Sequence, residues 1–170
     1  RKRDVPGDTC VSCGIWRKRG VNRIVEKLID RIKQLNDPTV VGLDTNFGYL
    51  PEEMRAGIET PAEAAKAIVD FNKQIVDAVA EIVPAVKVQI AYYEMYGVEG
   101  MRAFDKTCRY AASKGLIVMT DAKRNDIGAT ASCYAKAYLG QTQVGGEKYS
   151  SFESDFLPVT GHRGSHGIQP

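Results

Sequence analysis

The sequence has no long apolar run, and this absence excludes a membrane-spanning helix. Such a helix needs about 18 or more consecutive apolar residues, and no stretch of the 170 residues approaches that length. The basic start, RKR, is not followed by the apolar core of a secretory signal. We therefore expect no membrane partner.

Net charge and cysteine are also scarce. The formal net charge is +2, and residues 1–20 hold six Lys or Arg against two Asp, so the remainder is slightly acidic. A near-neutral body argues against a nucleic-acid partner. The four cysteines, Cys10, Cys13, Cys108 and Cys133, are too scattered for a secreted disulfide framework. We expect a cytoplasmic protein, a basic tail over residues 1–20, and Cys108 and Cys133 as small core residues.

What the sequence does contain is an alternation of helical and strand patterns. Hydrophobic periodicity predicts helices over residues 21–36, 59–83, 97–115 and 129–140, strands over 39–44, 84–91, 116–123 and 152–160, and a loop over 141–151. Such alternation is typical of a parallel sheet of βαβ units. The stretch after the first strand, VGLDTNFGYLP, lacks the G-x-G-x-x-G spacing of dinucleotide-binding folds. The expected fold is therefore an α/β (β/α)₈ TIM barrel.

The helix expected over residues 59–83 has the clearest boundary signals. Thr60 can cap it, Pro61 suits its first turn, and Glu63 completes a capping box. Its apolar positions, spaced at three and four residues, are expected to line one face: Ile68, Phe71, Ile75, Val79 and Ile82.

Charged residues recur at or near the ends of the predicted strands. Asp44 ends the first strand, Lys87 lies in the second, and Asp121 and Lys123 end the third. Asp121 and Lys123 are two residues apart and so should share the inner face of the sheet. Active sites of (β/α)₈ barrels lie at the carboxyl ends of the strands. The pattern predicts an acid–base cluster there.

These residues carry a resemblance to a known family. The stretch DAKRNDIGATASCYAKAYLG resembles the D-x-K-x-x-D signature and following helix of orotidine 5′-phosphate decarboxylase in its longer bacterial form. VGLD resembles the first strand of that family, and VKVQIAYYEMYG resembles its second strand and the segment after it. The resemblance runs from about residue 22 to the end of the sequence.

The resemblance implies a homodimer that converts orotidine 5′-phosphate to uridine 5′-phosphate without a metal or other cofactor. By motif position, Asp44 would bind ribose hydroxyls and Lys87 would hold the ribose and the charge network. Asp121 would lie beside the scissile carboxylate, and Lys123 would protonate C6 of the product carbanion. The remaining two residues, Asp126 and Thr130, would reach into the active site of the partner subunit.

The sequence also departs from this family. A (β/α)₈ barrel takes about 250 residues, whereas residues 21–170 supply only an N-terminal half that stops after about the fourth strand. We expect such a half-barrel to be unstable, aggregated or inactive by itself. Near the end, Pro158 falls inside the expected fourth strand and Thr160 replaces the asparagine expected from the family.

Two alternative functions stay open, one from the resemblance and one from the cysteine and histidine residues. The D-x-K-x-x-D signature is shared by Mg²⁺-dependent sugar-phosphate decarboxylases and synthases of the same superfamily. A non-catalytic zinc-binding fragment is the other alternative, because Cys10 and Cys13 form a C-x-x-C pair and the two histidines, His162 and His166, lie near the other end.

Overall fold

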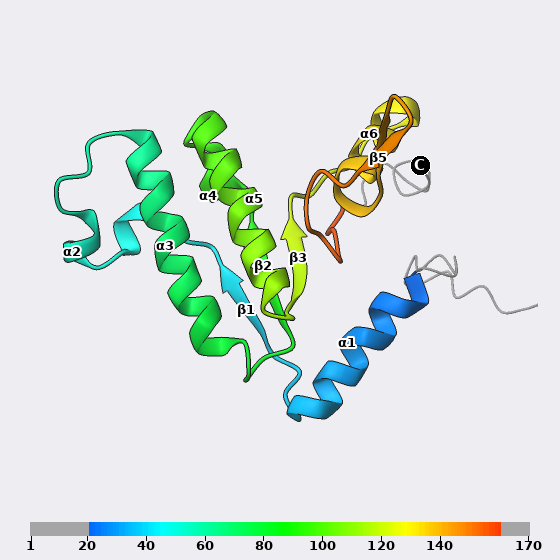
Figure 1. Ribbon diagram of the computed structural model, residues 1–170, viewed down its shortest axis with the longest axis horizontal. Helices are drawn as coiled ribbons and strands as arrows, with labels where there is room; N and C mark the ends of the chain where they lie inside the picture. Colours follow the sequence, from blue (N-terminus) through cyan, green and yellow to red (C-terminus); the bar gives the residue numbers. More distant parts are fainter. Residues whose placement is uncertain (1–20, 161–170) are drawn as a thin grey trace, which may run out of the picture.

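The computed structural model describes residues 21–160. Its elements follow the predicted alternation of strands and helices, with five short additions: η1, α2, α4, β4 and β5 (Figure 1). They are α1 (Val21–Leu35), β1 (Val40–Leu43), the 3₁₀ turn η1 (Phe47–Tyr49), α2 (Glu52–Arg55), α3 (Pro61–Val79), β2 (Ala85–Gln89), α4 (Ala91–Glu94), α5 (Gly97–Ser113), β3 (Ile117–Asp121), α6 (Gly128–Leu139), β4 (Thr142–Val144) and β5 (Glu147–Tyr149).

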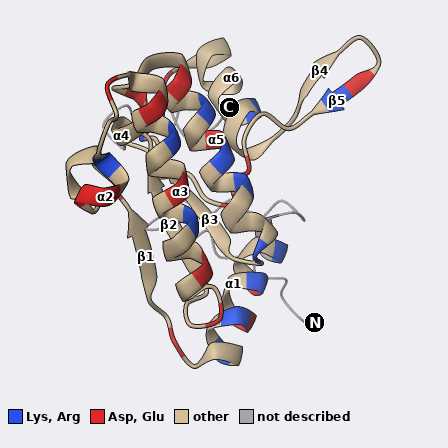
Figure 2. Cartoon of the chain, turned by 60° about the vertical axis from the view of Figure 1, so that its left-hand side comes forward, with Lys and Arg blue, Asp and Glu red and all other residues tan. Residues whose placement is uncertain are grey.

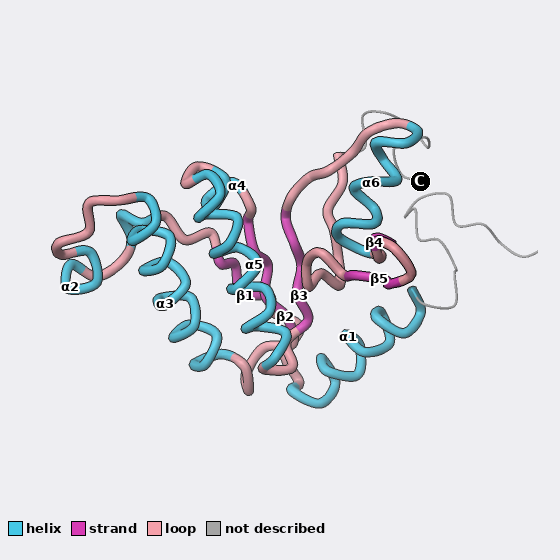
Figure 3. Tube along the Cα trace, turned by 45° about the horizontal axis from the view of Figure 1, so that its top comes forward, coloured by secondary structure: helices cyan, strands magenta, loops and turns pink. Residues whose placement is uncertain are grey.

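The centre of the molecule is a parallel three-stranded sheet in the order β1-β2-β3. Val86 and Val88 of β2 point toward the helical side, where they join the core with α3 and α5. Lys87 and Gln89 point to the opposite face, as strand alternation requires. Figure 3 shows α3 and α5 together on one side of the strands, while α1 lies at the end where the strands begin. The predicted α/β class and parallel pairing are confirmed.

Helix α3 begins where the sequence signals predict. The Thr60 side chain accepts a hydrogen bond from the Glu63 amide at 3.3 Å, and the Glu63 carboxylate accepts one from the Thr60 amide at 3.0 Å. This capping box satisfies amides that the first turn leaves without helical partners. The helix ends at Val79, so the prediction for Ile82 is wrong: this side chain lies beyond the helix and is 55% exposed.

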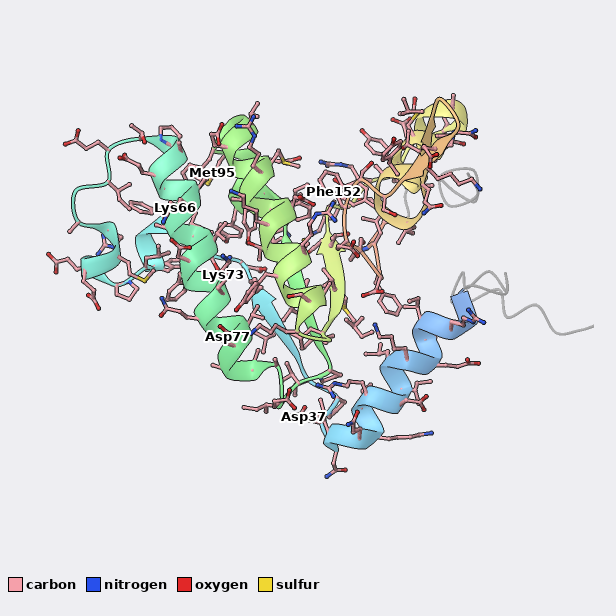
Figure 4. All side chains as sticks on the ribbon, viewed as in Figure 1. Asp37, Lys66, Lys73, Asp77, Met95 and Phe152 are labelled. Atoms are coloured by element: carbon pink, nitrogen blue, oxygen red, sulfur yellow. The ribbon has the colours of Figure 1, made fainter. Side chains whose placement is uncertain are left out.

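An aromatic cluster attaches the C-terminal part of the described chain to the core. The Phe104 ring of α5 packs edge-on against Tyr93 at 5.6 Å and against Phe152 at 5.5 Å between ring centroids. Phe152 also stacks on Tyr138 of α6 at 5.2 Å. Figure 4 shows Phe152 near the carboxyl end of β3. The segment after β5 is therefore held beside β3 by ring packing.

The fourth strand expected over residues 152–160 is reduced to a single parallel bridge between Met119 and Phe156. The Phe156 amide donates to the Val118 carbonyl, and the Phe156 carbonyl accepts from the Thr120 amide. Continuing the ladder would require residue 158 to donate to the Thr120 carbonyl, but Pro158 has no amide hydrogen. The Ala122 amide instead donates a hydrogen bond to the Thr120 carbonyl at 2.9 Å, and the strand pairing ends at this point.

The loop prediction for residues 141–151 is wrong over most of its length. Strands β4 and β5 pair as an antiparallel hairpin, with Val144 opposite Glu147. Gly145 adopts a φ of +61° at the two-residue turn, a conformation that glycine reaches without a steric penalty. Figure 2 shows the hairpin projecting from the body of the molecule, and its colours mark charged residues along the helices.

The two cysteines in the helices differ in environment. Cys108 is fully buried in α5, and its burial raises the pKa of the thiol well above the ordinary range. Cys133 is exposed, so its placement in the core was wrong. Helix α6 is rich in alanine and buries only Ala131 and Tyr138, which gives residue 133 no core to face.

The remaining predictions concern a membrane-spanning helix and the two ends of the chain. Among the helices of this stretch, none is both long enough and apolar enough to cross a membrane. The basic tail over residues 1–20 and the zinc ligands Cys10, Cys13, His162 and His166 lie outside the described residues.

Candidate active site

The parallel register brings the predicted strand-end residues into neighbouring positions. Lys87 of β2 lies opposite Gly42 of β1, and Gln89 lies opposite Asp121 of β3. Asp44 follows β1 directly. The carboxyl ends of the three parallel strands therefore lie together at one edge of the sheet (Figure 3).

Four of the six predicted site residues form one continuous chain of ion pairs. Lys87 Nζ lies 2.6 Å from Asp44 Oδ1 and 3.5 Å from Asp121 Oδ2. Lys123 Nζ lies 2.5 Å from the other oxygen, Asp121 Oδ1. The order Asp44, Lys87, Asp121, Lys123 alternates in sign, so each inner group has an opposite charge on both sides.

Asp121 is the buried centre of this chain. Its side chain is 11% exposed, against 58% for Lys123. A carboxylate so far from water requires charged or polar partners. It has three, because the Gln89 amide donates to Asp121 Oδ2 at 2.9 Å in addition to the two lysines. Its position is therefore fixed from the carboxyl end of β2 and from the turn that follows β3.

The backbone changes course at Lys123. Strand β3 ends at Asp121, and Lys123 has a φ of +50°, in the left-handed region that is uncommon for a residue with a side chain. The two residues were predicted to share one face of a continuing strand. Their side chains do meet, but through a turn that folds Lys123 back toward Asp121.

Asp126 and Thr130 lie beyond this turn. Asp126 is half-buried on the loop before α6, where its Oδ1 accepts a hydrogen bond from the Ile127 amide at 2.8 Å. Thr130 is exposed in the first turn of α6. Their predicted contribution to a neighbouring subunit stays a prediction.

The sequence reasoning missed a buried polar network behind the site. Asn72 of α3 is completely buried; its Oδ1 accepts from the Thr45 hydroxyl at 2.6 Å, and its Nδ2 donates to the Tyr93 hydroxyl at 2.7 Å. Burial raises the pKa of the Tyr93 phenol, which keeps it protonated. Thr45 follows Asp44, and Tyr93 lies on the helix after β2, so Asn72 links the ends of two strands that carry site residues.

In residues 21–160, no three His, Cys, Asp or Glu side chains are grouped so that they could hold a metal ion. Asp44 and Asp121 both face Lys87, whose ammonium lies between their carboxylates. The arrangement can stabilise charge and move a proton through the lysines.

Comparison with known proteins connects this geometry to one family. Residues 57–165 match the orotidine 5′-phosphate decarboxylase / HUMPS family. The chain is 37% identical over 150 residues to an orotidine 5′-phosphate decarboxylase of Caldicellulosiruptor saccharolyticus, covering 85% of this chain and 49% of the relative. It is also 37% identical over 147 residues to one of Clostridium perfringens, covering 86% of this chain and 47% of the relative.

A solved structure agrees with these matches. The structure of Leishmania donovani OMP decarboxylase is similar with a TM-score of 0.64 and 26% identity, over 86% of this chain and 48% of that one. The chain thus spans about half the length of the curated relatives it matches, and its three-stranded sheet corresponds to half of their TIM barrel.

Proposed function

The chain belongs to the orotidine 5′-phosphate decarboxylase / HUMPS family, and on this premise we propose that it supplies the catalytic half of a cytoplasmic decarboxylase acting on orotidine 5′-phosphate. The observation that carries the proposal is the alternating chain of Asp44, Lys87, Asp121 and Lys123. Those residue types at those strand ends suit a reaction in which negative charge develops at one carbon.

The proposed chemistry is cleavage of the bond between C6 and the carboxylate. The bonding electrons stay on C6 as CO₂ leaves, and no neighbouring group of the ring absorbs them. A fixed ammonium can stabilise this charge and then transfer its proton to C6. Lys123 is proposed as that donor, since its compact charge on a flexible stem suits both tasks. The product is uridine 5′-phosphate, and no cofactor takes part.

The other side chains have supporting roles in this proposal. Asp121 would lie beside the scissile carboxylate and repel it until CO₂ departs. Asp44 would bind the ribose hydroxyls, with Lys87 joining the ribose to the charge network. The carboxylates of Asp44 and Asp121 would hold the two lysine ammonium groups in place through ion pairs. Asp126 and Thr130 would complete the site of the partner subunit in a homodimer.

The test uses a chimera, because the chain spans about half of its relatives. Residues 21–170 are joined to the part of the Caldicellulosiruptor saccharolyticus relative that this chain does not cover. We expect the chimera to decarboxylate orotidine 5′-phosphate and Lys123→Ala to lower kcat at least about 100-fold. The matched control is Lys66→Ala, which removes an exposed lysine of α3 that pairs with Asp70.

An assay in the presence of a chelator distinguishes this proposal from the alternative, a metal-dependent sugar-phosphate enzyme. Decarboxylation that is insensitive to a strong chelator supports the proposal. Loss of activity in chelator, restored by Mg²⁺, would instead support a metal-dependent sugar-phosphate enzyme of the same family.

A further inference from the structure

Arg124 follows Lys123, the proposed proton donor, in a polar loop. Its side chain makes several specific contacts with the protein, although most charged side chains in such loops extend into solvent. Arg124 Nη2 donates to Glu94 Oε1 at 2.5 Å, and Nη1 donates to the Ala122 carbonyl at 3.1 Å. Its guanidinium also lies over the Tyr134 ring, 5.7 Å from the centroid. The Arg124 side chain is 26% exposed, so these contacts hold it against the protein.

These contacts join three parts of the fold around the turn. Glu94 is the last residue of α4, the short helix that follows β2. Ala122 is buried directly after β3, and Tyr134 is a half-buried residue of α6. A planar guanidinium can make directional hydrogen bonds in its plane and stack on a ring through its face. Arg124 uses both modes at once.

Lys123 lies between Ala122 and Arg124 in the sequence, and these two neighbours make the contacts described above. Its φ of +50° is unfavourable for a residue with a Cβ atom, so the surrounding structure must maintain it. On one side, the Ala122 amide donates to the Thr120 carbonyl at 2.9 Å. On the other side, Arg124 is fixed to Glu94 and to the carbonyl of Ala122. The backbone of Lys123 is thereby held at both neighbours.

We propose that Arg124 is a positioning residue that fixes the left-handed turn at Lys123 and so keeps the Lys123 ammonium against Asp121. Its importance for catalysis rests on the proposed function, in which Lys123 is the proton donor. The geometric claim does not depend on turnover. A lysine at position 124 would keep the charge but lose the planar fork and most of the stacking.

The experiment measures how accessible the Lys123 amine is in the 170-residue chain. Trace acetylation with acetic anhydride, followed by mass spectrometry, gives the labelling of Lys123 relative to Lys66. We expect the Lys123/Lys66 ratio to rise about threefold in Arg124→Lys and in Arg124→Gln, as the ion pair with Asp121 loosens. The matched control Arg102→Gln, which removes an exposed α5 pair with Glu99, should leave the ratio unchanged.

The Arg124→Gln variant separates positioning from a simple charge effect. Removing a neighbouring positive charge raises the pKa of a lysine, and a more protonated amine reacts more slowly with anhydride. A charge effect alone therefore predicts a lower ratio, whereas release of the turn predicts a higher one. An unchanged or lowered ratio in both Arg124 variants, with helical circular dichroism retained, would overturn the proposal.

A third variant, Tyr134→Leu, tests the proposal if the two Arg124 variants do not fold. Tyr134→Leu keeps every charge and removes only the ring beneath Arg124. A raised Lys123/Lys66 ratio in this variant supports the proposal, and an unchanged ratio contradicts it when the Arg124 variants do not fold. Because no arm measures decarboxylation, a failure of the proposed function leaves this result readable.

Discussion

At the scale of single residues, Asn72 has no contact with the proposed substrate site but supports two of its strand ends. Its side-chain amide is the shared partner of the Thr45 and Tyr93 hydroxyls, and all three residues are buried. A buried polar network of this kind stabilises only when its members are satisfied together. Its spacing from Ile68 and Val76 puts Asn72 in the middle of the buried face of α3.

Asn72→Leu should lower the free energy of unfolding by at least about 2 kcal/mol, because it leaves two buried hydroxyls without their partner. Urea denaturation of the dilute chain measures the change. The matched control is Gln74→Leu at an exposed position of the same helix, which should stay within about 0.5 kcal/mol of the parent. Equal effects of the two substitutions would contradict the role given to Asn72.

The sequence predicted the charged residues of the site more completely than their supports. Asp44, Lys87, Asp121 and Lys123 could be found because charge at the end of an apolar strand stands out from its surroundings. Asn72 could not, since one amide inside an apolar helical pattern gives no periodic signal. Gln89 and Arg124 were equally hidden, because their importance depends on which strand end and which helix lie beside them.

At the scale of elements, the contact between α4 and α5 depends on one glycine. A Cβ atom at Gly100 would lie 1.7 Å from the carbonyl oxygen of Tyr93, and backbone cannot give way as a flexible side chain can. The close approach brings Tyr93 onto Phe104 and so supports the aromatic cluster.

Gly100→Ala should therefore destabilise the chain by about 1–3 kcal/mol through overpacking. Gly146 provides the control: an added Cβ there meets no atom within 4 Å, so Gly146→Ala should change stability by less than about 0.5 kcal/mol. Thermal or urea unfolding of both variants tests this. An unchanged free energy of unfolding in Gly100→Ala would mean that α4 and α5 can move apart without loss of stability.

A second element-scale contact joins α3 to the end of α5 and depends on pH. The Asp77 carboxylate accepts from Lys114 Nζ at 2.6 Å and from the Tyr110 hydroxyl at 2.8 Å. The hydrogen bond from Lys114, with that from Tyr110, lowers the pKa of Asp77. Figure 4 shows Asp77 and Lys73 on α3, and Lys73 lies over the same Tyr110 ring.

A lowered carboxyl pKa stabilises the fold above the unfolded value, about 3.9, and this contribution disappears as the pH falls through the folded value. Asp77→Asn should thus be less stable than the parent at about pH 6, and the difference should shrink toward zero near pH 2 to 3. Urea titrations at several pH values measure it, with Glu81→Gln as the control. A difference independent of pH would exclude this assignment.

The elements also show where sequence patterns fail. The predictions of α3, α5, β2 and β3 succeeded because each of these elements buries several apolar residues. Helix α1 was predicted from the spacing of its apolar residues, although it contributes none of the buried core residues. Sequence patterns predict a loop where the β4–β5 hairpin lies, because all six of its strand residues are exposed and give no apolar alternation. Only Gly145 and Gly146, between the two exposed triplets, indicate a turn there. The fourth strand was predicted from its apolar residues, and Pro158 stopped it after one bridge.

At the scale of the whole molecule, the described chain is an open half of a barrel. Strand β1 is an edge of the sheet within residues 21–160, and its Val40 is 41% exposed. A hollow of about 450 Å³ lies between α1 and the start of β3. It is lined by Arg23, Glu26, Lys27, Asp30, Arg31, Gln34, Gly115 and Ile117.

The proposed dimer can be tested by mixing two inactive chimeras. If Asp126 completes the site of the partner subunit, a hybrid of Lys123→Ala and Asp126→Ala subunits contains one site with neither substitution. Random re-assortment should then restore about one quarter of the parental activity. Activity that stays at the level of the separate variants would show that Asp126 acts within its own subunit.

The most direct test of the central claim is the decarboxylation rate of the chimera with and without the Lys123 amine. The account predicts that the chimera converts orotidine 5′-phosphate in the presence of chelator. It predicts that Lys123→Ala loses at least about 100-fold in kcat, while Lys66→Ala keeps the parental rate. Near-parental decarboxylation by the Lys123→Ala chimera would contradict the account.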